Sequence, residues 1–225
     1  SMQNYEHTVE GTGHKVYEHN SCALCGCWWA AKIAGDGSPN GYQVFIGEGN
    51  TFTDWYYMGY SKGMNTKSHQ MRLYRGNQAN GTAKSGTDTY GVKGFYGFNF
   101  SDDVLLANVY NADSQWEIKV YEDDVYSGTM TMIPNKKTSP SAGNPTKPST
   151  SSSQDWWAIG YHIGVVGRGY VGGGRANYLS NCFHIYKYTL KNKNAKIRVE
   201  ATDRFGRTYS STEIIGDYDY SLMTR

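Results

Sequence analysis

The sequence of 225 residues lacks the features that mark several protein classes. No apolar run approaches the roughly 20 residues that cross a bilayer, so we expect no transmembrane segment. The 22 Lys and Arg residues are scattered and are nearly balanced by 20 Asp and Glu residues, without the basic cluster of a nucleic-acid-binding protein. The 27 Gly residues follow no Gly-X-Y period, which excludes collagen. A globular chain with no nucleic-acid partner remains.

Helical patterning is also missing, because no window carries an apolar stripe with caps at both ends. Aromatic residues are plentiful instead, with 20 Tyr and 6 Trp, and these side chains favour strands. Apolar and polar residues alternate in Gln115–Tyr121 and in Lys196–Thr202, which predicts strands with one face in a core. Further strands are predicted at Tyr42–Ile46, Met71–Tyr74, Val104–Tyr110, Thr129–Ile133 and Cys182–Leu190. The predicted fold class is all-β: one or more antiparallel β-sandwiches with long irregular loops and little helix.

Composition divides the chain into blocks. Residues 1–76 form a β-rich block, residues 77–100 a connection rich in Gly and Thr, and residues 101–225 a C-terminal β-sandwich. Inside the last block, residues 134–155 hold four of the five prolines among Ser, Thr and Lys. We expect a low-complexity surface loop there, because such a segment buries too little apolar surface to offset the ordering of its backbone. The sequence leaves open whether the two β-rich blocks share one core.

No catalytic residue, metal ligand set or cofactor is predicted in this chain. Two-metal hydrolases need clustered Asp, His and Asn ligands that hold ions about 3.5–4 Å apart. Neither Asp-x-His, Gly-Asn-His-Asp nor Gly-His-x-His occurs, and the Gly-x-Ser-x-Gly elbow of serine hydrolases is missing too. Gly167–Gly172 matches the dinucleotide fingerprint in letters, but the two glycines that follow it disfavour the helix that this motif must begin. We interpret it as a Gly-rich loop.

Three of the four cysteines lie close together. Cys22, Cys25 and Cys27, with His19 upstream, have the spacing of half a zinc site, whereas structural zinc needs four ligands. The alternative is that they pack as small apolar residues beside the neighbouring tryptophans.

Polar residues in loop-like settings are the candidates for contact with a ligand. His14, His19 and Asn20 form such a group near an aromatic pair. In contrast, Asp203–Gly206 predicts a turn whose Asp accepts local backbone hydrogen bonds. His184 lies in an apolar strand and is expected to be a hydrogen-bonded structural residue.

An ordered set of segments runs through most of the chain. The set is His19–Ala23, Gly26–Trp29, Asp36–Tyr42, Gln70–Tyr74, Asn108–Asp113, Trp116–Glu122, Phe183-His184 and Val199–Tyr209. Over about residues 14–213, it resembles the C-terminal module of bacterial calcineurin-like phosphoesterases, with DGSPNGY and TDRFGRTY as its most specific pieces. The resemblance implies a catalytic domain upstream that holds two divalent metals and hydrolyses phosphate esters. It also implies export to the periplasm, the cell surface or the medium.

Two functions of different classes follow. The first is a non-catalytic accessory region, inactive alone, that packs on the upstream phosphoesterase domain and shapes access to its metal centre. In that hypothesis the elements on the side of a phosphorylated substrate are Trp28, Trp29, Asp36, Asn40 and Tyr42, beside His14, His19 and Asn20. The alternative is a β-sandwich that binds carbohydrate or another surface polymer, a glycan for which the surplus of Tyr and Trp would offer a platform.

Overall fold

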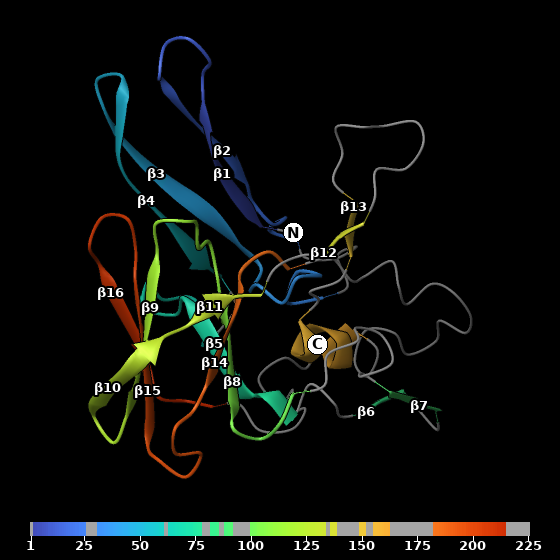
Figure 1. The fold of residues 1–225 in the computed structure, drawn as a ribbon. Coiled ribbons are helices and arrows are strands. Elements are labelled where there is room, and N and C mark those ends of the chain that lie inside the picture. Colours follow the sequence, from blue (N-terminus) through green and yellow to red (C-terminus); the bar gives the residue numbers. More distant parts are fainter. Residues whose placement is uncertain are drawn as a thin grey trace.

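The computed structural model shows a chain built from antiparallel sheets (Figure 1). It describes residues 2–25, 31–60, 63–77, 82–85, 88–91, 100–133, 136–138, 149–151, 155–162 and 182–214. Two four-stranded sheets pack face to face, and two longer hairpins project from them.

The first sheet of the sandwich contains the strands with the clearest alternation. Its strands, in order, are β10 (Val125–Thr129), β9 (Glu117–Glu122), β15 (Ile197–Thr202) and β16 (Thr208–Ser211). In β15, Ile197, Val199 and Ala201 are buried and the residues between them are half-buried. In β9, Ile118 and Val120 are buried in the same way. The alternation therefore predicted both the strands and their inner faces.

The second sheet joins the two β-rich blocks of the sequence. Its strands, in order, are β11 (Thr131–Met132), β14 (Ile185–Thr189), β8 (Val104–Val109) and β5 (Met71–Arg75). Every residue of β8 is buried, because the strand has neighbours on both edges and both of its faces are covered. Since β5 precedes the connection at 77–100 and β8 follows it, both blocks contribute to one sheet.

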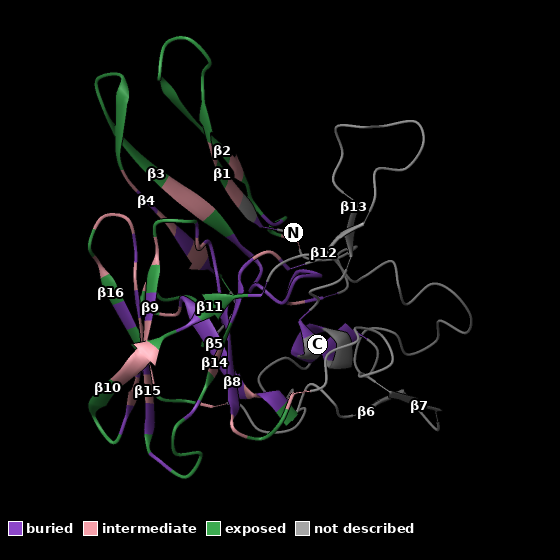
Figure 2. Cartoon of the chain, viewed as in Figure 1, coloured by how far each residue is buried: buried purple, intermediate pink, exposed green. Residues whose placement is uncertain are grey.

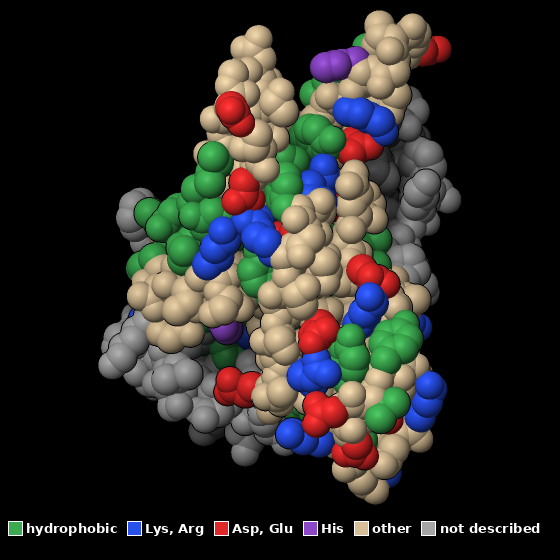
Figure 3. All heavy atoms as spheres, turned by 90° about the vertical axis from the view of Figure 1, so that its left-hand side faces the viewer, with side chains coloured by type: hydrophobic (Ala, Val, Ile, Leu, Met, Phe, Trp, Pro, Cys, Tyr) green, Lys and Arg blue, Asp and Glu red, His purple; other side chains and the backbone are tan. Residues whose placement is uncertain are grey.

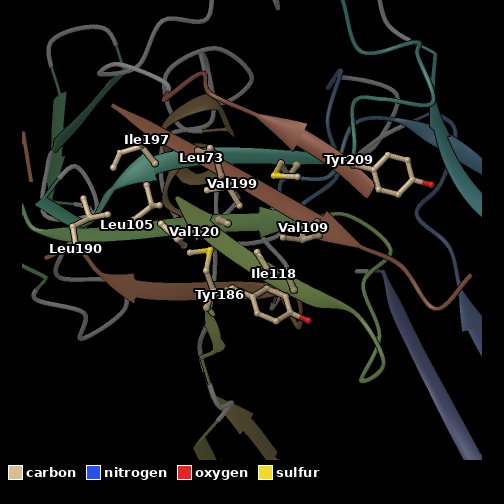
Figure 4. Packing of buried hydrophobic residues seen from close by; sticks show 14 of the residues in the cluster. Leu73, Leu105, Val109, Ile118, Val120, Tyr186, Leu190, Ile197, Val199 and Tyr209 are labelled. Carbon is tan, nitrogen blue, oxygen red and sulfur yellow. The ribbon is translucent and has the colours of Figure 1, made fainter. Parts of the chain in front are cut away.

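The core between the two sheets takes side chains from each of them (Figure 4). Its labelled members are Leu73, Leu105, Val109, Ile118, Val120, Tyr186, Leu190, Ile197, Val199 and Tyr209. Burial of this kind stabilises a fold by about 25 cal/mol for each Å² of apolar surface removed from water. The predicted antiparallel β-sandwich is confirmed.

One predicted strand is wrong in its bounds. In place of a single strand at Thr129–Ile133, β10 ends in the first sheet and β11 begins in the second. The N–H of Met130 donates to the carbonyl of Ile118, whereas the N–H of Ile133 donates to the carbonyl of Ile185. The chain changes sheets at this point, so one period-2 pattern cannot run through it.

Two hairpins, here called the hairpin pair, extend beyond the sandwich (Figure 1). Their strands are β1 (Gln3–Thr8), β2 (Lys15–Asn20), β3 (Gly41–Glu48) and β4 (Thr51–Gly59). Gly11, Gly13 and Gly49 take positive φ in the two end turns, a conformation that glycine adopts without strain. The outer parts of both hairpins are exposed (Figure 2). The sequence predicted only β3 among these four strands.

The remaining elements are short. They are β6 (Thr82–Ser85), β7 (Asp88–Gly91), β12 (Lys136–Thr138), β13 (Ser149–Ser151) and the helix α2 (Trp156–Tyr161). β12 and β13 come from within the Pro-rich segment 134–155 and pair with each other. Within the described ranges, no helix has the length and apolar content needed to cross a membrane.

Candidate functional site

Exposed large hydrophobic side chains gather on the hairpin pair and the loops beside it. Among the described residues, ten of them lie between residues 5 and 60 and three lie in the sandwich. The ten are Tyr5, Val9, Val16, Tyr17, Leu24, Tyr42, Phe45, Ile46, Phe52 and Tyr60, and the three are Val125, Tyr126 and Met132. Single exposed apolar residues are ordinary, whereas a concentration of them marks a surface that contacts a partner.

The facing sides of the two hairpins meet in a cluster of rings, here called the aromatic seam: Tyr17, His19, Phe45, Trp55 and Phe205. Ring centroids are 5.4 Å apart for Tyr17 and Trp55, 5.0 Å for His19 and Phe45, and 4.7 Å for Trp55 and Phe205. The His19–Phe45 and Trp55–Phe205 pairs meet edge to face, an arrangement that the ring quadrupole favours. Phe205 follows β15, so the seam fastens both hairpins to the sandwich.

Arg204 adds a positive charge to the aromatic seam. Its guanidinium carbon lies 4.8 Å from the centroid of the Tyr17 ring and 4.9 Å from that of the Trp55 ring. Its Nε donates to Asp113 Oδ2 at 2.8 Å, and its second carboxylate neighbour, Glu6, lies at 4.0 Å. The Arg204 and Asp113 side chains are almost fully buried, so this ion pair and its ring contacts are shielded from solvent screening.

A turn predicted from the sequence positions these groups. Asp203 Oδ1 accepts hydrogen bonds from the backbone N–H groups of Phe205 and Arg207, both at 2.9 Å, and Gly206 has φ of 79°. The structural interpretation of Asp203–Gly206 is confirmed, and the turn presents Arg204 and Phe205 to the hairpin pair.

His19 is the one candidate from the sequence that lies in the seam. Nδ2 of Asn4 donates a hydrogen bond to Asn111, so Oδ1 of Asn4 is an acceptor. His19 Nδ1 therefore donates to Asn4 Oδ1, at 2.9 Å. Burial and then the charge of Arg204 lower the pKa of His19, so its ring is neutral at pH 7 and Nε2 carries the lone pair. Nε2 is buried and has no hydrogen-bond partner among the described residues. The ring therefore packs as an aromatic side chain.

The other candidates do not assemble into one site. His14, Asn20 and Tyr42 are exposed, and His14 lies in the end turn of β1–β2, about 16 Å along the strand from His19. Asn40 is fully buried and donates through Nδ2 to the carbonyl of Ala31 at 2.6 Å. Trp28 and Trp29 lie outside the described residues.

Asp36 is also buried, within a set of polar residues here called the buried polar cluster: Asp36, Arg72, Asn108, Asp155 and His184. Asn108 lies at its centre. Its Nδ2 donates to Asp155 Oδ2 at 2.7 Å and to the carbonyl of Asp36 at 3.0 Å, and its Oδ1 accepts from His184 Nδ1 at 2.7 Å. Arg72 donates to the carbonyl of Gly37 at 2.7 Å and lies 4.0 Å from Asp155. His184 is thus the hydrogen-bonded structural residue that the sequence predicted.

The Asp36 carboxylate is held in its ionised form. It accepts from the N–H of Met2 at 2.5 Å and from that of Ser38 at 3.0 Å, and His184 Nε2 lies 3.5 Å away. Burial alone would raise the pKa of Asp36, but the hydrogen bond and charge of His184 outweigh it, and the pKa is lowered. The cluster therefore joins the start of β1 to the second sheet.

The chemistry open to this cluster is limited. Cys182 Sγ lies 3.4 Å from His184 Nδ1, but burial raises the pKa of this thiol, which keeps it protonated and unreactive. Cys22 donates to Asp36, and no group of three or more His, Cys, Asp or Glu side chains in the described part of the chain is arranged to hold a metal ion. The sequence did not reveal the cluster, because its members are scattered from position 36 to 184 and form no motif.

One family model matches the chain. It is MetallophosC, described as the C terminal of calcineurin-like phosphoesterase, and it covers residues 18–209. No curated protein and no solved structure matches the chain. The matched range begins within β2 and ends within β16, so it includes the sandwich except for the end of β16, together with the whole β3–β4 hairpin.

Proposed function

Because the chain belongs to the family of calcineurin-like phosphoesterase C-terminal regions, we propose that it is a non-catalytic accessory region that packs on the upstream phosphoesterase domain. The whole protein is then an exported, metal-dependent hydrolase of phosphate esters, with its two divalent ions in that upstream domain. The accessory region shapes access to the metal centre.

The observation that carries this proposal is the uneven distribution of exposed hydrophobic side chains. Ten of the thirteen lie between residues 5 and 60, on or beside the hairpin pair, while the sandwich buries the facing sides of both its sheets. A domain within the same polypeptide is available to cover this surface, and contacts between domains of one chain commonly bury about 600–1,500 Å².

The test compares three proteins: the full-length phosphoesterase, the catalytic domain alone, and residues 1–225 alone. Residues 1–225 should hydrolyse neither a phosphate monoester nor a diester with Mn²⁺, Mg²⁺ or Zn²⁺. Removal of the accessory region should lower the melting temperature of the catalytic domain and alter its kcat/KM between small and large substrates. Metal-dependent turnover by residues 1–225, or a catalytic domain unchanged in both respects, would contradict the proposal.

Export is tested separately. Fractionation of the source cells should place the full-length protein outside the cytoplasm, and its recovery in the cytoplasmic fraction would refute this part of the proposal.

A second candidate function, carbohydrate binding, is favoured by one surface of the sandwich. Tyr121 and Tyr126 meet edge to face at 5.8 Å on the first sheet, and Arg198 lies over the Tyr121 ring at 4.0 Å. Exposed rings beside charged hydrogen-bonding groups suit the faces and hydroxyls of sugars. A glycan array sensitive to millimolar affinity, with Tyr126→Ala as the matched variant, tests this function, and an array without hits would rule it out.

A further inference from the structure

The two hairpins enclose an apolar notch. Trp55 on β4 links the two hairpins here, with its ring 5.4 Å from that of Tyr17 on β2 and 6.4 Å from that of Phe45 on β3. The Phe52 ring lies 5.5 Å from that of Phe45. These side chains are partly open to solvent, Phe52 by 57%. Figure 3 shows the hairpins as two projections with a notch between them, and hydrophobic side chains gather at its floor. We call the surface formed by Tyr17, Phe45 and Phe52 the notch.

The charges beside the notch are paired. On the face of β1–β2 that carries Tyr17, Lys15 Nζ donates to Glu6 Oε1 at 2.5 Å. At the floor, Arg204 is paired with Asp113, and the His19 ring is neutral at pH 7. With no free cation among these residues to attract a phosphate group, the notch fits an apolar segment.

The exposed surface of the notch has the size of a small docking site. Its three side chains are exposed by 39% for Tyr17, 37% for Phe45 and 57% for Phe52. At roughly 150–250 Å² for a fully exposed aromatic side chain, they present on the order of 250 Å² of apolar surface. A patch of this size suits a few apolar side chains of a partner, as one part of the roughly 600–1,500 Å² that contacts between domains commonly bury.

The covalent connection brings one partner close to the notch. Met2 is fully buried and its N–H is bound to Asp36, so the chain is held firmly at the foot of β1. β1 has six residues and spans about 20 Å, less than the width of an ordinary domain. A domain joined upstream of Met2 can therefore reach from the foot of the hairpin to the notch.

We infer that the notch receives an apolar segment of the catalytic domain of the same polypeptide. The inference rests on the proposed function and specifies the surface through which it acts. The segment fills the space between Tyr17 and Phe52, and the outer faces of both hairpins, with Ile46 and Val16, remain in solvent.

Cysteine labelling of the full-length protein tests this inference. Phe52→Cys places a thiol in the notch, Ile46→Cys places one on the outer face of the same hairpin, and Val125→Cys places one on the sandwich, where the native side chain is 69% exposed. Maleimide labelling is followed at each site by peptide mass spectrometry, which separates it from labelling of the native cysteines. Phe52→Cys should react at least tenfold more slowly than the two controls.

The outcomes distinguish this inference from the proposed function. If all three sites are labelled equally and X-ray scattering shows that the full-length protein is compact, the notch is not the contact. The two domains then pack through another surface, and the proposed function stands. Equal labelling in an extended particle overturns the proposed packing as well. Protection of Phe52→Cys that vanishes on dilution, together with a dimeric mass, shows that a second copy fills the notch and also overturns the inference. Slow labelling of Phe52→Cys in a monomer supports it.

Discussion

The sandwich and the hairpin pair contain strands of similar length, but they bury their apolar residues to very different extents. All six residues of β8 are buried, whereas β3 has one buried residue at its base and an exposed outer half. A four-stranded sheet can cover one face with a second sheet, but a two-stranded hairpin is marginally stable by itself. The sandwich therefore supplies its own stability, and the hairpin pair depends on the aromatic seam and on Arg204.

The largest expected effect comes from two histidines outside the hairpin pair, His69 and His162. Burial, with the charge of Arg72 as a second cause, lowers the pKa of His69 to about 4, and burial lowers that of His162 to about 4. An unfolded histidine titrates near 6.5, so between pH 6.5 and 4 the unfolded chain binds protons that the folded chain does not. Stability is full above this window and falls as the pH drops through it. The 2.5-unit difference corresponds to about 3 kcal/mol for each histidine.

Urea unfolding of the chain at about pH 7 and about pH 4.5 measures this loss. His69→Gln should flatten the pH dependence, whereas His14→Gln, in the exposed turn of the β1–β2 hairpin, should leave it unchanged. The lowered pKa of Asp36 acts in the same direction but in a lower pH range, because its stabilisation is present above about pH 4 and is lost as the pH falls below that value. Constant stability from pH 7 to 4.5 would contradict the assignment.

A smaller loss is expected from a cavity in the sandwich. Leu105→Ala removes a fully buried side chain between the two sheets and should lower the free energy of unfolding by about 2–5 kcal/mol. Ile46→Ala, on the exposed face of β3, should change it by about 0.5 kcal/mol or less in the isolated chain. Urea denaturation of the two variants gives both values, and equal losses would mean that the hairpin pair is as well packed as the sandwich.

The smallest of the three effects concerns the connection between the two regions. Arg204→Met keeps the apolar stem but leaves Asp113 without its cation, which should cost about 2 kcal/mol. This value is below that of most broken buried pairs, because Asp113 keeps the hydrogen bond from the N–H of Gln115. Hydrogen exchange should accelerate in β1–β4 more than in β8 and β15. The control is Arg198→Met, whose partly exposed pairs with Asp124 and Glu200 contribute about 0–1 kcal/mol. If hydrogen exchange accelerated equally in the hairpin pair and in the sandwich, Arg204 would not act specifically as the connection between them.

The strands of the sandwich could be predicted because their pattern has a period. β9 and β15 each have one face in the core and one toward solvent, so their sequences alternate. β1, β2 and β4 were missed, because hairpins that project into solvent place apolar residues on both faces and blur the alternation. The passage of the chain from β10 in the first sheet to β11 in the second was missed, because a change of sheet leaves no local signal in the sequence.

The candidate site was predictable only in part. Asp36 and Asn40 were recognised as candidates, but the exposure of their side chains depends on what packs around them, and the buried polar cluster surrounds Asp36 with residues from distant strands. His19 was recognised as a candidate, but its partner rings Phe45 and Trp55 come from β3 and β4 of the other hairpin. The role of Arg204 could not be read from the sequence, because a turn residue shows no sign of the rings that it will contact.

The sequence by itself determined the all-β class, the inner faces of its most regular strands and the family. The class and the inner faces follow from local alternation of apolar and polar residues, and the family follows from an ordered set of short segments. Only the tertiary structure decided that both β-rich blocks contribute to one sheet, that Asp36 and Asn40 are buried while Tyr42 is exposed, and that exposed apolar side chains gather on the hairpin pair. The physical reason is that burial and electrostatic pairing depend on contacts between residues far apart in the chain, and no local pattern encodes those contacts.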